Sequence, residues 1–142
     1  METTELHRGR LIDHIQLVVR NLKASRAFYT AVLEVLHVPM GGEQEDFFWA
    51  DELCVSTADS DAAQGQLTGR THVAFQVTDR AMVDAFHKAA LAHGRQGQRR
   101  PRRAPVPPGL LRRLCPGLRR QHIEAVYHGA AKRSAGSVKI TF

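Results

Sequence analysis

Apolar and polar residues alternate in two short stretches of the chain, and each stretch leads into a longer one with a different period. The alternating positions are Ile15, Leu17 and Val19 against His14, Gln16 and Val18, and then Val73, Phe75 and Val77 against His72, Ala74 and Gln76. A period of two predicts a strand with one apolar face. We therefore expect strands at 14–19 and 72–77, with both histidines opposite the apolar face and turned toward a common interior.

The residues after each predicted strand repeat their apolar positions every three or four residues. These positions are Ala24, Phe28, Ala31, Val32, Val35 and Leu36 in the first stretch, and Met82, Phe86, Ala89 and Ala90 in the second. Such spacing is typical of a helix with one buried face. Asn21 and Asp79 precede the helices as N-caps, and Gly94 is placed to end the second helix.

The two strand–helix stretches align without a gap at an offset of 58 residues, so that His14 meets His72 and Phe28 meets Phe86. The chain therefore reads as two copies of one unit. We expect one domain over residues 1–142, with a first module at about 11–60 and a second at about 70–130. Further short strands are predicted within 46–59, turning near Ala50 and Asp51, and at 122–128. For residues 137–142 the pattern leaves two alternatives, an edge strand or a loose end.

The quoted stretches "DHIQLVVRNLKASRAFYTAVLEVL", "THVAFQV" and "IEAVYHG" resemble the vicinal oxygen chelate superfamily. That superfamily includes glyoxalase I, extradiol dioxygenases, fosfomycin-resistance enzymes and bleomycin-resistance proteins. The resemblance covers residues 11–94 and 122–131. It implies an α+β fold in which two βαβββ modules form a curved, half-open mixed sheet around a central cavity.

The resemblance also implies a metal site, since metal-dependent members hold the ion on the first strand of each module and on the last strand. Carried over residue by residue, the ligands are His14, His72 and Glu124. Two neutral imidazoles and one carboxylate suit Fe, Mn, Ni or Zn as divalent ions and leave coordination positions open. The sequence does not select one of these metals.

Gln16, Trp49 and Gln76 are the candidate substrate-binding residues, and no catalytic residue is identified. Gln16 and Gln76 share strand faces with the two histidines, and Trp49 lies in the aromatic run "FFW". Cys54 stands in the apolar run "LCV", which predicts a buried, inert thiol.

The favoured function is a metal-dependent small-molecule enzyme, a lyase or dioxygenase that binds two vicinal oxygens of its substrate. The alternative is a binding or sequestering protein of the bleomycin-resistance type that performs no chemistry. The resemblance also implies a homodimer. No apolar run approaches the roughly 20 residues of a membrane span, and no signal peptide begins the chain, so we expect a cytoplasmic protein without a membrane partner.

Charge is concentrated in residues 95–121, which hold nine arginines and five of the six prolines and no acidic residue. Subtracting those nine charges from the net charge of +6 leaves −3 for the remainder. Binding of nucleic acid through this segment is therefore a third hypothesis. It is disfavoured because the segment lacks the interleaved aromatic residues of a base-stacking surface.

The same segment stands where the second module needs strands, and its prolines and arginines predict that strands are lost there. The genetic code offers an explanation. Codons exist for residues 96–121 that read "RDNGAPGAPPYHPGYYGAFVLDFDGN" when shifted forward by one base, which supplies a loop, an aromatic strand and a turn. We therefore hypothesise a frame-shifted segment, which sequencing of the coding DNA across codons 94 to 122 tests.

Overall fold

The two predicted strand–helix pairs are present in the predicted order, β2 followed by α1 and β6 followed by α2. A computed structural model describes residues 5–9, 11–94, 111–116, 121–127, 129 and 134–141. The chain divides into two compact units. The first unit contains Met1–Arg26, Val38–Thr68 and Lys132–Phe142, and the second contains Ala27–His37 and Gly69–Ala131. Each unit is described by itself.

The first unit contains a four-stranded sheet in the order β2-β5-β4-β3. Its strands are β2 (Ile15–Val19), β3 (Gly42–Glu43), β4 (Phe47–Ala50) and β5 (Leu53–Thr57). Strand β2 runs parallel to β5, and the other pairs are antiparallel. The predicted turn between β4 and β5 is confirmed, since Asp51 takes a positive φ of 44° there. A short 3-10 turn, Asp61–Ala63, follows β5.

The second unit repeats this pairing in a sheet of the order β6-β8-β7 among the described residues. Its strands are β6 (Thr71–Gln76), β7 (Leu111–Pro116) and β8 (Gln121–Tyr127). The first strand again runs parallel to the last, and the last pairs antiparallel with the strand before it. A parallel pair requires a crossover connection, and a helix fills that connection in both copies. The predicted α+β fold class is confirmed.

The two helices are α1 (Leu22–Val35) and α2 (Arg80–His93), and both begin at the predicted caps. The Asn21 Oδ1 accepts from the Ala24 N–H at 2.9 Å, and the Asp79 Oδ1 accepts from the Met82 N–H at 2.8 Å. Each side chain satisfies a backbone donor that the first helical turn leaves open. Gly94 ends α2 in an extended conformation, with φ −81°, and its N–H donates to the Ala90 carbonyl.

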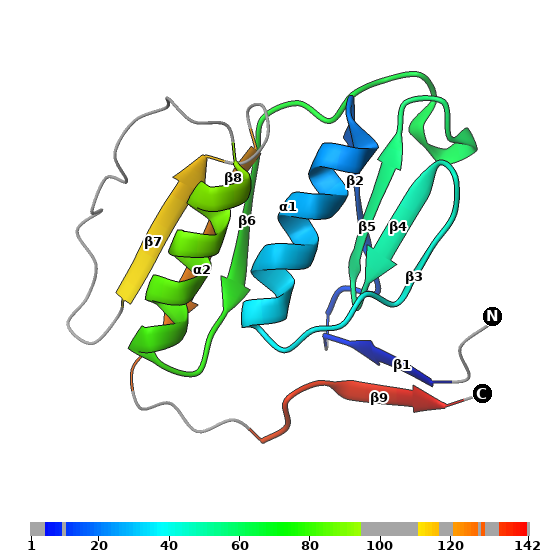
Figure 1. Cartoon of the computed structure of the whole chain (residues 1–142). Helices are drawn as coiled ribbons and strands as arrows, with labels where there is room; N and C mark the ends of the chain where they lie inside the picture. Colours follow the sequence, from blue (N-terminus) through cyan, green and yellow to red (C-terminus); the bar gives the residue numbers. More distant parts are fainter. Residues whose placement is uncertain are drawn as a thin grey trace. The chain divides into compact units, whose positions relative to one another are not determined.

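Helix α2 packs on β7 and β8 (Figure 1). Its buried residues are Val83, Phe86 and Ala90, so Phe86 and Ala90 agree with the predicted apolar face, whereas Val83 was not predicted and Met82 and Ala89 are only half-buried. Phe86 is fully buried, and its ring centroid lies 5.9 Å from that of Phe75 on β6. In α1 the buried face consists of Ser25, Phe28, Tyr29, Val32 and Leu33. Burial raises the pKa of the Tyr29 hydroxyl well above its usual value, so that this group stays neutral.

Of the two alternatives for residues 137–142, the structure shows a strand, β9 (Val138–Thr141), whose partner was not predicted. It pairs antiparallel with β1 (Glu5–Arg8), from Glu5 opposite Thr141 to Arg8 opposite Val138, as Figure 1 shows. The stretch ELHR in β1 is too short and too polar for an alternating apolar pattern to predict a strand. Its backbone hydrogen-bond partners come from β9, which is distant in the sequence.

The expectation that strands are lost within residues 95–121 is wrong for one part of that segment. Residues 111–116 form β7, which pairs with β8 from Leu111 opposite Tyr127 to Pro116 opposite His122. Pro116 is the last residue of β7, and β7 lies at the edge of the sheet among the described residues, where a missing ladder donor is tolerated. The remainder of the segment, apart from Gln121 in β8, lies outside the described residues. The hypothesis of nucleic-acid binding concerns this segment and therefore also falls largely outside the described residues.

Candidate functional site

One face of the β6–β8 pair gathers imidazole and carboxylate side chains. Strand β6 alternates as predicted, with His72, Ala74 and Gln76 on its exposed side. The parallel register sets His72 beside His122 and Ala74 beside Glu124. Because register partners in a sheet share a face, both residues of β8 stand on the same side as His72.

Glu124 is buried on this face, with 4% of its surface exposed. Its Oε2 lies 3.3 Å from the Nε2 of His72, whose side chain is 52% exposed. The contact is close enough for charge attraction, yet it lacks hydrogen-bond geometry, and Oε2 has no hydrogen-bond partner among the described residues. Burying a carboxylate oxygen without a donor is costly. A cation held between this oxygen and the imidazole would remove that cost, so the pair fits a metal ion.

His122 is a residue of this face that the sequence analysis missed. It is exposed, and its ring centroid lies 6.5 Å from that of His72, with the ring planes tilted by 42°. The spacing of His122 from Glu124 could have predicted its position. His122 precedes Glu124 by two residues, and on a strand this spacing places both side chains on one face.

His14, the third predicted ligand, belongs to the first unit. It lies one residue before β2 and not within the strand as predicted, because the ladder begins where the Ile15 N–H donates to the Glu52 carbonyl at 2.7 Å. The His14 side chain is 63% exposed, and its Nδ1 lies 2.7 Å from the Asp13 Oδ1. A carboxylate at Nδ1 is the usual way to orient a histidine whose Nε2 binds a metal.

Of the three predicted ligands, His14 belongs to the first unit, and His72 and Glu124 belong to the second. The structure brings His72 and Glu124 into contact. Among the described residues of either unit, no three His, Cys, Asp or Glu side chains are gathered closely enough to hold a metal ion as they stand. His72 and Glu124 form the best-defined part of the candidate site.

Gln16, a predicted substrate contact, forms a hydrogen bond with another side chain. Its Nε2 donates to the Ser56 Oγ at 2.7 Å, and Ser56 is buried. Its register partner Cys54 is half-buried, which corrects the prediction of a buried thiol. Burial, with a smaller contribution from the charge of Asp46, raises the pKa of the Cys54 thiol and disfavours the thiolate.

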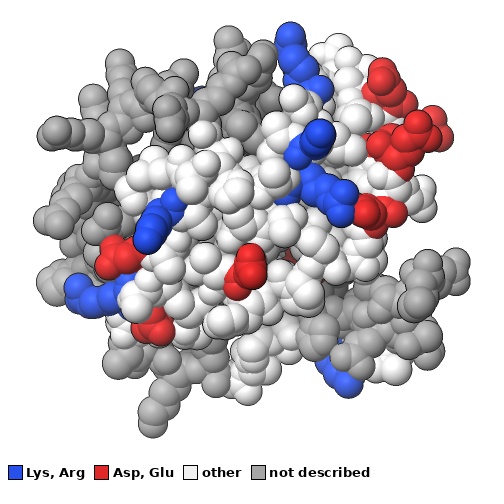
Figure 2. Space-filling model, viewed as in Figure 1, with Lys and Arg blue, Asp and Glu red and all other residues white. Residues whose placement is uncertain are grey.

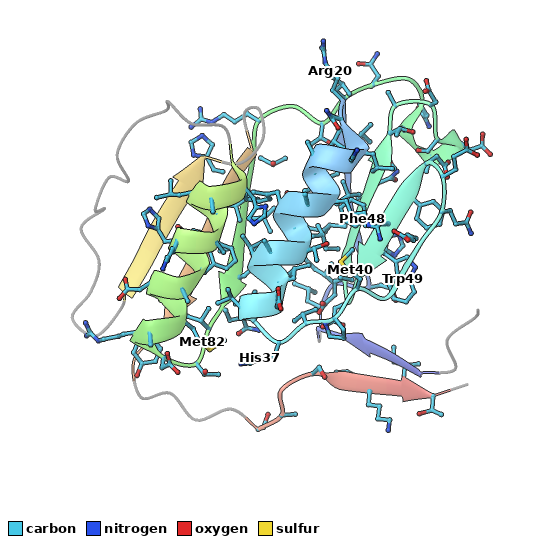
Figure 3. The ribbon with its side chains drawn as sticks, in the orientation of Figure 1. Arg20, His37, Met40, Phe48, Trp49 and Met82 are labelled. Carbon is cyan, nitrogen blue, oxygen red and sulfur yellow. The ribbon has the colours of Figure 1, made fainter. Side chains whose placement is uncertain are left out.

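Trp49 packs against two glycines of its own unit. A Cβ on Gly41 would lie 2.2 Å from Trp49 Cζ3, and one on Gly42 would lie 2.8 Å from Trp49 Nε1. Figure 3 shows Trp49 beside Phe48 on β4. The indole of Trp49 therefore packs against the backbone at Gly41 and Gly42. Part of the indole is still exposed, and its contact with a substrate stays a prediction. Gln76 is exposed near the end of β6, opposite Val126.

A pocket of about 320 Å³ lies elsewhere in the first unit, between the first turn of α1 and the β3–β4 hairpin. Its lining residues are Leu22, Lys23, Arg26, Glu43, Gln44, Glu45, Phe47 and Phe48. Arg26 and Glu43 form an ion pair with half-exposed side chains. None of the predicted ligands or substrate contacts lines this pocket.

The described surface carries charges of both signs. Figure 2 shows acidic and basic side chains interspersed over the described part of one face. No helix in the described part of the chain is both long and apolar enough to span a membrane.

Solved structures from several bacteria share this fold. A glyoxalase/bleomycin resistance protein from Albidiferax ferrireducens superimposes with a TM-score of 0.63 at 20% identity, covering 82% of this chain and 97% of its own. A lactoylglutathione lyase from Agrobacterium tumefaciens gives 0.58 at 19% identity, covering 82% and 92%. A genomically encoded fosfomycin resistance protein from Listeria monocytogenes gives 0.56 at 20% identity, covering 86% and 94%. At these identities the likeness concerns the fold alone.

Comparison of the sequence itself gives the family. No curated protein matches the chain. Residues 11–109 match the family model described as the Glyoxalase/Bleomycin resistance protein/Dioxygenase superfamily, and this range is more than half of the chain. The matched residues contain both helices and both strands that begin the two copies. The chain belongs to the glyoxalase/bleomycin resistance protein/dioxygenase superfamily.

Proposed function

We propose that this protein is a metal-dependent small-molecule enzyme of the glyoxalase or dioxygenase type. The observation that carries the proposal is the buried Oε2 of Glu124, which has no hydrogen-bond partner and lies 3.3 Å from the His72 Nε2. Names of similar structures, a lactoylglutathione lyase and a fosfomycin resistance protein, fit a small-molecule substrate.

His72 and Glu124 would hold the ion, with His14 as the third ligand. Two imidazoles and one carboxylate accept Fe, Mn, Ni or Zn, and they leave positions for two vicinal oxygens of a substrate. A divalent ion there supplies charge stabilisation for an enolate, catecholate or alkoxide. Within the protein, the Asp13 carboxylate orients the His14 ring and burial fixes the Glu124 carboxylate.

Metal analysis of the full-length chain tests this proposal. The purified protein is expected to carry one equivalent of a divalent metal, and the chelator-treated protein to bind Zn²⁺ in a calorimetric titration. Glu124→Gln and His72→Gln are expected to weaken Zn²⁺ binding by at least about 10-fold, the effect typical of losing groups at a metal site. His93→Gln is the matched control, because His93 lies exposed at the end of α2.

A wild-type protein that carries none of the four metals and binds no Zn²⁺, while remaining folded by circular dichroism, would contradict the enzyme proposal. That result would favour the alternative of a metal-free binding or sequestering protein.

A further inference from the structure

We propose that His122 is an additional metal-binding residue, and that His72, His122 and Glu124 form a two-imidazole, one-carboxylate set within the second unit. The inference rests on the proposed function and deepens it. It predicts that the second unit retains the ion when His14 is removed.

The strand register carries the first step. Strand β8 runs parallel to β6 with His122 opposite His72, and Glu124 follows His122 by two residues. All three side chains therefore leave the same face of one sheet. The proposed metal-binding side chains lie on two neighbouring strands that backbone hydrogen bonds hold in place. Strands position metal ligands more precisely than loops do.

Distances and exposure carry the second step. His72 Nε2 already lies 3.3 Å from Glu124 Oε2, and the two imidazole centroids are 6.5 Å apart. Two imidazoles on one ion, each with a metal–nitrogen distance of about 2 Å, have centroids roughly 5 Å apart. The proposal therefore requires the two rings to move closer by about 1.5 Å. Both His72 and His122 are exposed, so solvent rather than packed protein surrounds much of each ring.

The buried carboxylate carries the third step. Glu124 Oε2 is inaccessible and has no donor among the described residues, and the two imidazoles nearest to it on this face are His72 and His122. A cation satisfies all three groups together, and a two-histidine, one-carboxylate set with open positions is typical of divalent transition metals. The other residues of this face on β6 are Ala74 and Gln76, which are poor ligands for such ions.

Cobalt provides a spectroscopic test on the full-length, chelator-treated chain. Co²⁺ absorption in the visible region reports the ligand set directly, and displacement of Co²⁺ by Zn²⁺ gives the affinity. We expect His122→Gln to change the Co²⁺ spectrum and to raise the Kd for Zn²⁺ by about 10- to 100-fold, as expected for loss of a group at a metal site. His14→Gln is expected to have the smaller effect on the Kd. His93→Gln serves as the control.

The outcomes separate the two proposals. Wild-type affinity and an unchanged Co²⁺ spectrum in His122→Gln, with binding lost in Glu124→Gln, would overturn the role of His122 and leave the metal enzyme intact. A wild-type chain that binds neither Co²⁺ nor Zn²⁺ would overturn both proposals. Circular dichroism and thermal melting of the metal-free variants show whether each one is folded, and His122→Asn provides a second substitution at this position if the glutamine variant is not.

Discussion

The two sheets share a pattern of strand pairing and differ in how their polar side chains are satisfied. In the first sheet Gln16 lies beside Cys54, and Gln16 donates to Ser56. At the repeat-equivalent positions of the second sheet Ala74 lies beside Glu124, whose buried Oε2 has no hydrogen-bond partner among the described residues. The first sheet pairs its polar side chains with each other, whereas the second leaves a buried carboxylate oxygen without a donor in the described part of the chain. The two copies therefore share their strand pairing and differ in the side chains that this pairing brings together.

Equivalent positions also differ in burial, and this difference gives the largest expected effect on stability. Leu33 is 3% exposed, whereas its repeat partner Leu91 is 52% exposed. We expect Leu33→Ala to lower the free energy of unfolding by about 2–5 kcal/mol, because it leaves a cavity. Leu91→Ala should change it by less than about 0.5 kcal/mol. Urea unfolding of both variants measures the difference, and equal losses would mean that the two copies are packed alike.

Glu124 gives the next largest effect, with the opposite sign. In metal-free protein we expect Glu124→Gln to raise the free energy of unfolding by about 1–2 kcal/mol, because a buried carboxylate lacking a donor is replaced by a neutral amide. The remaining partner, His72, is half exposed and loses little. His72→Gln should instead lower stability, since it removes the nearest compensating group. Chemical denaturation in the presence of a chelator measures both, and a loss of stability in Glu124→Gln would show that the carboxylate is satisfied in solution.

Removing the helix caps is expected to have the smallest effect on the free energy of unfolding. Here we expect the same loss in both copies. Asn21→Ala and Asp79→Ala each remove a side-chain acceptor for a backbone donor in the first helical turn. Each should cost about 1 kcal/mol of unfolding free energy. Thermal melting of the single and double variants checks this expectation. A double variant that loses clearly more than the sum of the single losses would show that the helices are coupled through their first turns.

Much of the fold could be predicted because each local signal agreed with the others. The alternation in 72–77, the caps at Asn21 and Asp79, and the repeat offset all point to the strands and helices observed. Strand β1 escaped prediction because its stability comes from pairing with β9 at the other end of the sequence. At the repeat offset of 58, Leu91 is the counterpart of Leu33 and the same residue type, yet Leu33 is buried and Leu91 is exposed. The exposure depends on what each helix packs against, which a residue-by-residue alignment does not contain.

The site was predicted less completely than the fold. His72 and Glu124 were predicted as ligands of one metal ion, and the structure places them in contact within the second unit, while their role as ligands stays a prediction. His122 was not predicted, because the resemblance supplies only the glutamate of this strand, although period two places His122 on the same face. Whether His14 joins them depends on how the two units are arranged, and no local pattern in the sequence encodes that arrangement.

The pairing of β1 with β9 also has a consequence for the order in which the chain folds. Glu5 lies opposite Thr141, so this ribbon closes a loop that contains almost all of the chain. The entropy cost of closing a loop grows with its length, and contacts between distant residues slow folding. Strand β1 is synthesised before β9, so this pair cannot form until β9 has left the ribosome.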